Sequence, residues 1–269
     1  MSKRVLFYLI TIFFVFGGIV TIETLLAIFE ANTLPHNALN TSNTFYMLQF
    51  GNVSEIVSIL MLIMIPISGS LLFTYIKNNN YFYSFIQRHS YKKFLSKALI
   101  VTFLTAFIFS LVILLYQLLL ISLSIHPLDW GNIDAKNVIS GVAMFDDGNL
   151  SSTVKFILLS SFGWGIYANL VFSIGLFIKK NAINIISGGI IGSSLIIVPA
   201  LVSHLFQGTL LKMVYIVSLP TLIAPGQMNV QYFGNQNKLY LYFVLSTMVY
   251  MSLTLGIVYF WIKKKQKEG

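Results

Sequence analysis

The chain has 269 residues, of which 57% are hydrophobic and only 9% are charged, whereas soluble domains carry about a quarter charged residues. It holds 17 Lys and Arg against 8 Asp and Glu, a net charge of +9. This composition excludes an ordinary soluble domain. In so apolar a chain, the basic excess predicts contact with anionic lipid headgroups and not with nucleic acid. The lack of cysteine excludes disulfides, thiolate metal ligands and a thiol nucleophile.

Six apolar segments are long enough to cross the hydrocarbon core of a bilayer, which takes roughly 20 helical residues. They lie at 5–29, 53–76, 98–125, 153–178, 182–204 and 240–262. The first begins with a basic stretch, as a signal peptide does. Its apolar run reaches Phe29 and no clean small-residue cleavage site follows, so we expect a retained span. The predicted fold class is all-α, a polytopic membrane protein forming one transmembrane domain over 1–269.

The basic residues are distributed unevenly among the predicted loops. Thirteen lie at the two ends of the chain or in the loops 77–97 and 179–181, whereas three lie in the loops 30–52, 126–152 and 205–239. Lys and Arg collect in cytoplasmic loops. The distribution therefore predicts that both termini are cytoplasmic.

The loop between the second and third spans, "YFYSFIQRHSYKK", combines aromatic and basic residues and contains no acid. Ser90 is suited to cap the next helix. Lys92 and Lys93 then fall in its first turn, where they oppose the helix dipole unless an anionic lipid or an acidic partner offsets them. A short amphipathic helix is predicted before them from residues at helical spacing, namely Phe82, Phe85, Ile86 and His89.

Two interpretations of this loop remain open. It is either an interfacial anchor that binds lipid, or a docking helix whose aromatic face, flanked by cations, binds a cytoplasmic partner. The residues expected to carry such docking are Phe82, Phe85, Ile86, Arg88, His89, Tyr91, Lys92 and Lys93.

The pattern R-x-S-x-K-K-x-x-x-K, which runs from Arg88 through Lys93 to Lys97, resembles that of bacterial ABC-2-type transporter permeases. The six-span layout, the minimal "KKN" junction at 179–181 and the partly apolar loop 205–239 are also similar to that family. The resemblance implies that residues 81–97 form a coupling helix, which sits in a groove of an ATP-binding subunit. It also implies that outer helices in 205–239 partly re-enter the membrane.

The resemblance further implies a permease subunit of an ATP-driven exporter in a bacterial plasma membrane, with a hydrophobic or amphipathic cargo such as a peptide. Two permease copies, or this chain and a homologue, would form the pathway, and two ATP-binding subunits would drive it. Similar permeases of low-GC Gram-positive bacteria export membrane-active peptides or confer immunity to them, including phenol-soluble modulins and lantibiotics. Two other functions remain open: a non-motor scaffold or accessory subunit, and a small-molecule-binding membrane component of an importer.

We predict no catalytic or metal site in this chain. It lacks the phosphate-binding pattern G-x-x-x-x-G-K-[ST], so ATP and Mg²⁺ are expected on a separate subunit. None of the four histidines pairs with another at a metal-ligand spacing. The G-x-S-x-G pattern of serine hydrolases is also absent. We therefore expect neither enzymatic activity nor a cofactor in this chain.

Four residues in the spans are candidates for a cargo pathway. Glu23 and Glu55 lie near the outer ends of the first two predicted spans, where each either reaches water or binds a cationic part of a cargo. Trp164 and Asn169 lie in the fourth span with Tyr167 and are candidates to line a path. For Asn169, an interhelical hydrogen bond is the simpler alternative.

Overall fold

The computed structural model describes residues 3–33, 41–49, 55–78, 82, 86, 90–124, 150–226 and 237–268. These residues form helices and no strands. The helices are α1 (Lys3–Thr33), α2 (Thr41–Leu48), α3 (Glu55–Asn78), α5 (Tyr91–Ser124), α6 (Leu150–Gly175), α7 (Asn181–Ser203), α8 (Gly208–Val217), α9 (Leu219–Ile223) and α10 (Asn237–Glu268).

Six of the described helices are long and apolar enough to cross a membrane: α1, α3, α5, α6, α7 and α10. This confirms the predicted fold class, an all-α polytopic membrane protein with six spans. Large apolar side chains also cover the outward faces; Phe14, Leu123 and Phe260 are 78%, 67% and 65% exposed. Such a surface is unfavourable in water but matches the chains of surrounding lipid.

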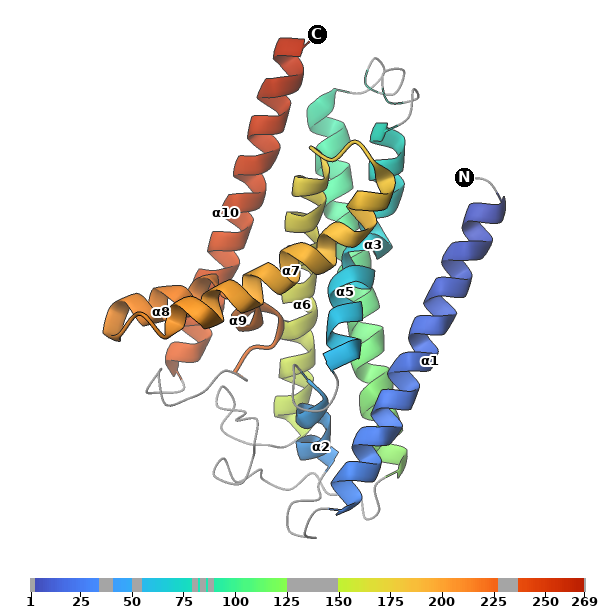
Figure 1. The fold of residues 1–269 in the computed structure, drawn as a ribbon, viewed down its shortest axis with the longest axis vertical. Coiled ribbons are helices and arrows are strands. Elements are labelled where there is room, and N and C mark those ends of the chain that lie inside the picture. The colour runs from blue at the N-terminus through green and yellow to red at the C-terminus, as the bar shows by residue number, and fades with distance from the viewer. Residues whose placement is uncertain are drawn as a thin grey trace.

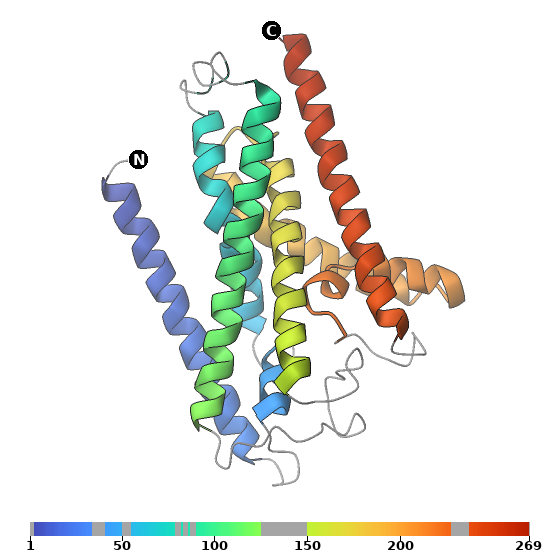
Figure 2. The ribbon, with the colours of Figure 1, turned by 180° about the vertical axis from the view of Figure 1, so that it is seen from behind.

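The start of α1 and the end of α10 lie at the same end of the bundle (Figures 1 and 2). At this end α3 stops, α5 begins and α6 turns into α7. We call it the basic end because it carries Lys77, Lys92, Lys93, Lys97, Lys179, Lys180, Lys263, Lys264, Lys265 and Lys267.

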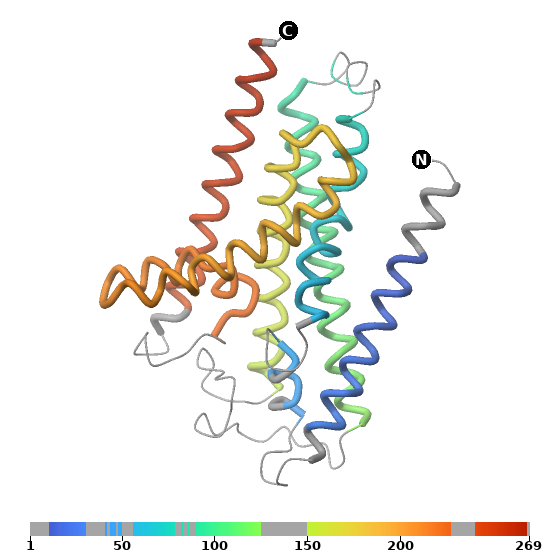
Figure 3. The backbone as a smooth tube through the Cα atoms, viewed as in Figure 1, coloured from blue at the N-terminus to red at the C-terminus, as the bar shows by residue number. Residues whose placement is uncertain are grey.

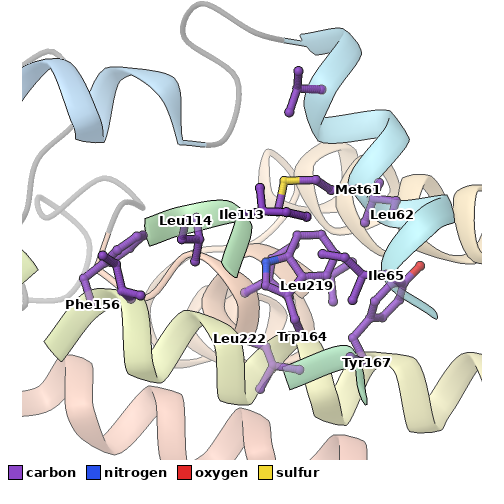
Figure 4. Packing of buried hydrophobic residues seen from close by; sticks show 14 of the residues in the cluster. Met61, Leu62, Ile65, Ile113, Leu114, Phe156, Trp164, Tyr167, Leu219 and Leu222 are labelled. Atoms are coloured by element: carbon purple, nitrogen blue, oxygen red, sulfur yellow. The ribbon is translucent and has the colours of Figure 1, made fainter. Parts of the chain in front are cut away.

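Helix α6 is the centre of the bundle. It packs against α3, α5, α7, α9 and α10, and 72% of its span is buried, against 28% of the α1 span. Figure 4 shows Trp164 of α6 close to Leu219 of α9, with Ile65 of α3 nearby. Lipid offers no hydrophobic drive to bring helices together, so close packing of this kind holds the bundle.

Two glycines allow α7 to pack closely on α3. A Cβ at Gly188 would lie 2.6 Å from the carbonyl oxygen of Leu62, and one at Gly192 would lie 2.6 Å from a side-chain carbon of the same leucine. The hydroxyl of Tyr167 on α6 donates a hydrogen bond to the Gly188 carbonyl. Figure 3 shows α7 crossing the other spans obliquely. This small-residue face of α7 therefore packs within the chain.

Helix α2 lies inside a segment predicted as a polar loop. It buries Phe45 and Tyr46 against Phe156 of α6, with ring centroids 6.1 and 5.1 Å apart. Just beyond it, the Gln49 amide donates to the Gln117 side chain at 3.3 Å. The eight residues of α2 are too few to give a clear periodic pattern, so only tertiary burial reveals the helix.

Helices α8 and α9 lie in the other long predicted loop, 205–239. All five residues of α9 are buried. Ser160 of α6 donates a hydrogen bond to the carbonyl of Ile223 at 2.5 Å, and Tyr250 of α10 donates to the carbonyl of Val217 at 2.8 Å. Two spans therefore supply donors to the carbonyl ends of these short helices. Re-entry of this loop into the membrane stays a prediction.

The contact at Gly188 gives a first prediction. Gly188→Ala should lower the free energy of unfolding by about 1–3 kcal/mol, because the new methyl group would overlap a backbone carbonyl. The control is Gly256→Ala on α10, where no atom of the described residues lies within 4 Å of the new Cβ. Both changes gain the same helix propensity, about 1 kcal/mol, which cancels in the comparison. Thermal unfolding in detergent micelles measures the difference, and equal stabilities would contradict the packing described.

Candidate functional site at the basic end

An aromatic cluster joins the loop after α3 to three spans. Phe82 is 4% exposed, and its ring centroid lies 5.5 Å from that of Phe94 on α5 and 6.1 Å from that of Trp261 on α10. Phe73 of α3 packs on Phe94 at 5.9 Å, and Tyr91 packs on Trp261 at 6.0 Å. Pairs of this geometry contribute roughly 0.5–1.5 kcal/mol each beyond area burial. The five rings, which we call the aromatic cluster, thus hold Phe82 firmly against α3, α5 and α10.

The N-terminus of α5 beside this cluster is strongly basic. Lys92, Lys93 and Lys97 are exposed, and the first turn contains no acid. Ser90 caps the helix through a long hydrogen bond, 3.4 Å, from the Lys93 backbone N–H to its hydroxyl oxygen. Positive charge at a helix N-terminus opposes the helix dipole. The arrangement therefore leaves a surface that an anionic group would stabilise.

Lys77 closes the end of the central helix. Its ammonium, on the last turn of α3, donates to the carbonyl oxygens of Gly175, Leu176 and Ile178 at 2.8, 3.0 and 2.6 Å. These contacts use all three of its N–H donors. A cation at the C-terminal end of a helix also suits the helix dipole. In the sequence, Lys77 stands out only as a loop charge at the end of an apolar span, and that position is the signal that could have indicated its role.

The structure brings together part of the predicted docking set. Phe82 and Tyr91 belong to the aromatic cluster, and the half-buried Ile86 packs against the same core. Lys92 and Lys93 lie beside them and face solvent. The remaining predicted members, Phe85, Arg88 and His89, lie outside the described residues.

The predicted pathway residues are spread over the bundle. Trp164 is 3% exposed and packs in the main core, where its ring lies 5.9 Å from that of Tyr167. Glu23 is half-buried in α1. Glu55 is the first residue of α3, and its side chain lies outside the described part of the chain.

Asn169 lines a cavity of about 400 Å³ between α5, α6 and α10. Its walls are mostly apolar, with Phe103 and Met251 on opposite helices. The buried side-chain oxygen of Asn169 accepts no hydrogen bond from any described residue. Neither Glu23 nor Trp164 is among the described residues that line this cavity. The cavity thus has a mostly apolar wall, and that wall includes one residue with a buried, unpaired acceptor.

Compared with known protein families, curated proteins and solved structures, the chain matches none. Its function is therefore inferred from its sequence and from the geometry at the basic end.

The role of Lys77 gives a second prediction. Lys77→Met keeps most of the side-chain volume but removes the donor to three carbonyls, which should cost about 1–3 kcal/mol of unfolding free energy. The control, Lys97→Met, removes an exposed charge at the same end and should change stability by less than about 0.5 kcal/mol. Thermal unfolding in micelles distinguishes the two. A loss of equal size in both variants would mean that Lys77 acts only as one more surface charge.

Proposed function

We propose that this chain is the transmembrane permease subunit of an ATP-driven ABC exporter, powered by a separate ATP-binding subunit. One observation carries the proposal. The connection between α3 and α5 is anchored by buried Phe82 in the aromatic cluster, while α5 presents Lys92 and Lys93 to solvent beside it. A rigid anchor and an exposed cationic surface are therefore adjacent on one connection, as a coupling element requires.

The anchor is suited to transmit movement. Packed interiors are nearly incompressible, so displacing one member moves the elements that hold it. Phe82 contacts rings from α5 and α10, and Phe94 in turn packs on Phe73 of α3. A push on residues 79–90 would therefore tilt three spans together, which is the kind of rigid-body shift that switches access between two sides.

The partner is expected to be acidic where it meets α5. Complementary charge across an interface speeds association and sets orientation, and an acid near Lys92 and Lys93 would also relieve the unfavourable charge at the start of the helix. This chain lacks the phosphate-binding pattern of ATPases. ATP and Mg²⁺ are accordingly assigned to the partner, of which two copies would serve two permease subunits.

The proposed cargo is hydrophobic or amphipathic, for example a membrane-active peptide. The cavity lined by Asn169 supports this choice, because its apolar walls between α5, α6 and α10 would hold an apolar chain. The side-chain oxygen of Asn169 is buried in this wall without a described hydrogen-bond partner, and a cargo group would have to displace its neighbours to bind it. Glu23 stays a candidate to bind a cationic group on such a cargo.

We assign the chain to a bacterial plasma membrane, with the basic end in the cytoplasm. The positive-inside rule supports this orientation, since the ten lysines named for the basic end come from four helix ends or junctions. The partner ATPase needs the same orientation, because ATP is cytoplasmic.

The docking prediction is tested by gentle-detergent purification from the native membrane, with mass spectrometry of copurifying proteins. An ATPase bearing the phosphate-binding motif should copurify with the parent chain. Lys92→Ala with Lys93→Ala should reduce its recovery at least tenfold, because exposed charge pairs at an interface contribute to both rate and affinity. The control is Lys155→Ala with Lys212→Ala, which removes the same charge on α6 and α8, away from the basic end.

Recovery of the ATPase with the control but not with the docking variant would support a coupling role for this connection. If no ATPase copurifies with the parent under conditions that preserve other complexes, the exporter function is wrong. A scaffold or accessory function would then explain the same surface.

The orientation is tested separately with single cysteines, since the chain has none of its own. Lys180→Cys, at the exposed junction before α7, should react with a membrane-impermeant thiol reagent only after cells are permeabilised. Ser151→Cys, exposed in the first turn of α6, should react in intact cells. The reverse pattern would place the basic end outside and contradict the proposed function.

A further inference from the structure

A cavity lined by lysines also lies at the basic end, and it is distinct from the basic surface at the start of α5. It is a cavity of about 200 Å³ between the end of α3, the junction after α6 and the last turns of α10. Lysines from all three segments line it: Lys77, Lys179, Lys264 and Lys265. Aromatic rings form much of the remaining wall: Phe82, Phe177 and Trp261. None of the described residues that line the cavity is acidic.

The lysines differ in whether their ammonium groups are available to bind a ligand. All three N–H donors of Lys77 bind carbonyl oxygens at the end of α6, so Lys77 contributes only its positive charge to the cavity. Lys264 lies 6.0 Å from the centre of the Phe177 ring, and this cation–π contact orients it at the cavity. Lys179 and Lys264 are exposed, and neither forms a hydrogen bond or ion pair with a described residue, so both can donate to a ligand.

Several like charges around one cavity repel one another, and a bound anion relieves that repulsion. Lysine is a point-charge donor suited to phosphate oxygens. The cavity lies where the α3 and α10 spans end, at Asn78 and Lys267. Phosphate headgroups lie at this depth, just outside the hydrocarbon, and aromatic rings such as Trp261 are favoured at the same level.

We propose that this cavity binds the phosphate headgroup of an anionic phospholipid from the leaflet at the basic end. A basic pocket between the ends of spans is the form that such recognition takes. The exposed ring of Phe177 would contact the glycerol and upper acyl chain. The bound lipid would also support the aromatic cluster, because Phe82 and Trp261 belong to both the cavity wall and the cluster.

The test uses purified full-length protein in neutral detergent, titrated with phosphatidylglycerol or phosphatidylcholine in mixed micelles. Thermal unfolding gives the apparent affinity, and native mass spectrometry counts retained lipids. Phosphatidylglycerol should raise the Tm saturably and remain bound, whereas phosphatidylcholine should not. Lys264→Gln with Lys265→Gln should weaken phosphatidylglycerol binding about 25-fold, at roughly fivefold for each lysine.

The matched control is Lys263→Gln with Lys267→Gln. These lysines lie on the same turns of α10 but do not line the cavity. Replacing them removes the same amount of charge. The control should change the affinity for phosphatidylglycerol by at most about twofold to threefold. Equal losses in the two double variants would mean that only diffuse surface charge attracts lipid, and would overturn the proposed site.

A third measurement distinguishes a lipid headgroup from free inorganic phosphate as the ligand of the cavity. Inorganic phosphate at millimolar concentration should neither raise the Tm of the parent nor displace phosphatidylglycerol. If it does both, and the lipid alone does nothing, the cavity takes a free anion and the lipid assignment is wrong. The Tm of each variant in lipid-free detergent shows that it is folded. None of these measurements needs an ATPase, so their outcome does not depend on the proposed exporter function.

Discussion

The end of α6, the most buried of the six described spans, is held by the ammonium group of one lysine. Helix α6 ends at Gly175 at the basic end, and the amine of Lys77 on α3 donates to the carbonyl oxygens of Gly175 and of Leu176 and Ile178 in the turn that follows. Lipid chains offer no donor to such carbonyls. The neighbouring side chain of Asn78 bonds Asn181 at the start of α7. The mutual placement of α3, α6 and α7 at this end depends on these contacts, and both proposed sites are built on that placement.

The same constraint explains two other long-range hydrogen bonds. Where α8 and α9 end against the bundle, hydroxyl groups from neighbouring spans supply donors: Tyr250 to Val217 and Ser160 to Ile223. In hydrocarbon an unpaired carbonyl is costly, so irregular backbone survives only where protein satisfies it. The short helix α9 is accordingly buried among other helices.

The two proposed sites share structural members. Phe82 and Trp261 lie in the aromatic cluster and also in the wall of the basic cavity. A headgroup in the cavity and a partner on α5 would therefore press on the same rings from different sides. The stiffness of the cluster would then depend on the surrounding lipid as well as on the partner, and the local membrane composition would affect any movement of α3, α5 and α10.

The sequence by itself determined the fold class and the number of spans, because the length of an apolar run is a local property that a bilayer selects directly. It also singled out the aromatic and basic connection after α3, since composition marks it without any knowledge of contacts. Only the tertiary structure decided what each polar or small residue touches. The sequence marks Lys77 only as a loop charge, and the placement of α6 beside it shows that its ammonium binds carbonyl oxygens. Trp164 stays a pathway candidate, and the structure adds that it packs against Leu219 of α9. The basic cavity brings together lysines that lie nearly two hundred positions apart in the sequence. Their proximity follows from the packing of helices that are distant in the chain, and such packing leaves no periodic pattern in the sequence.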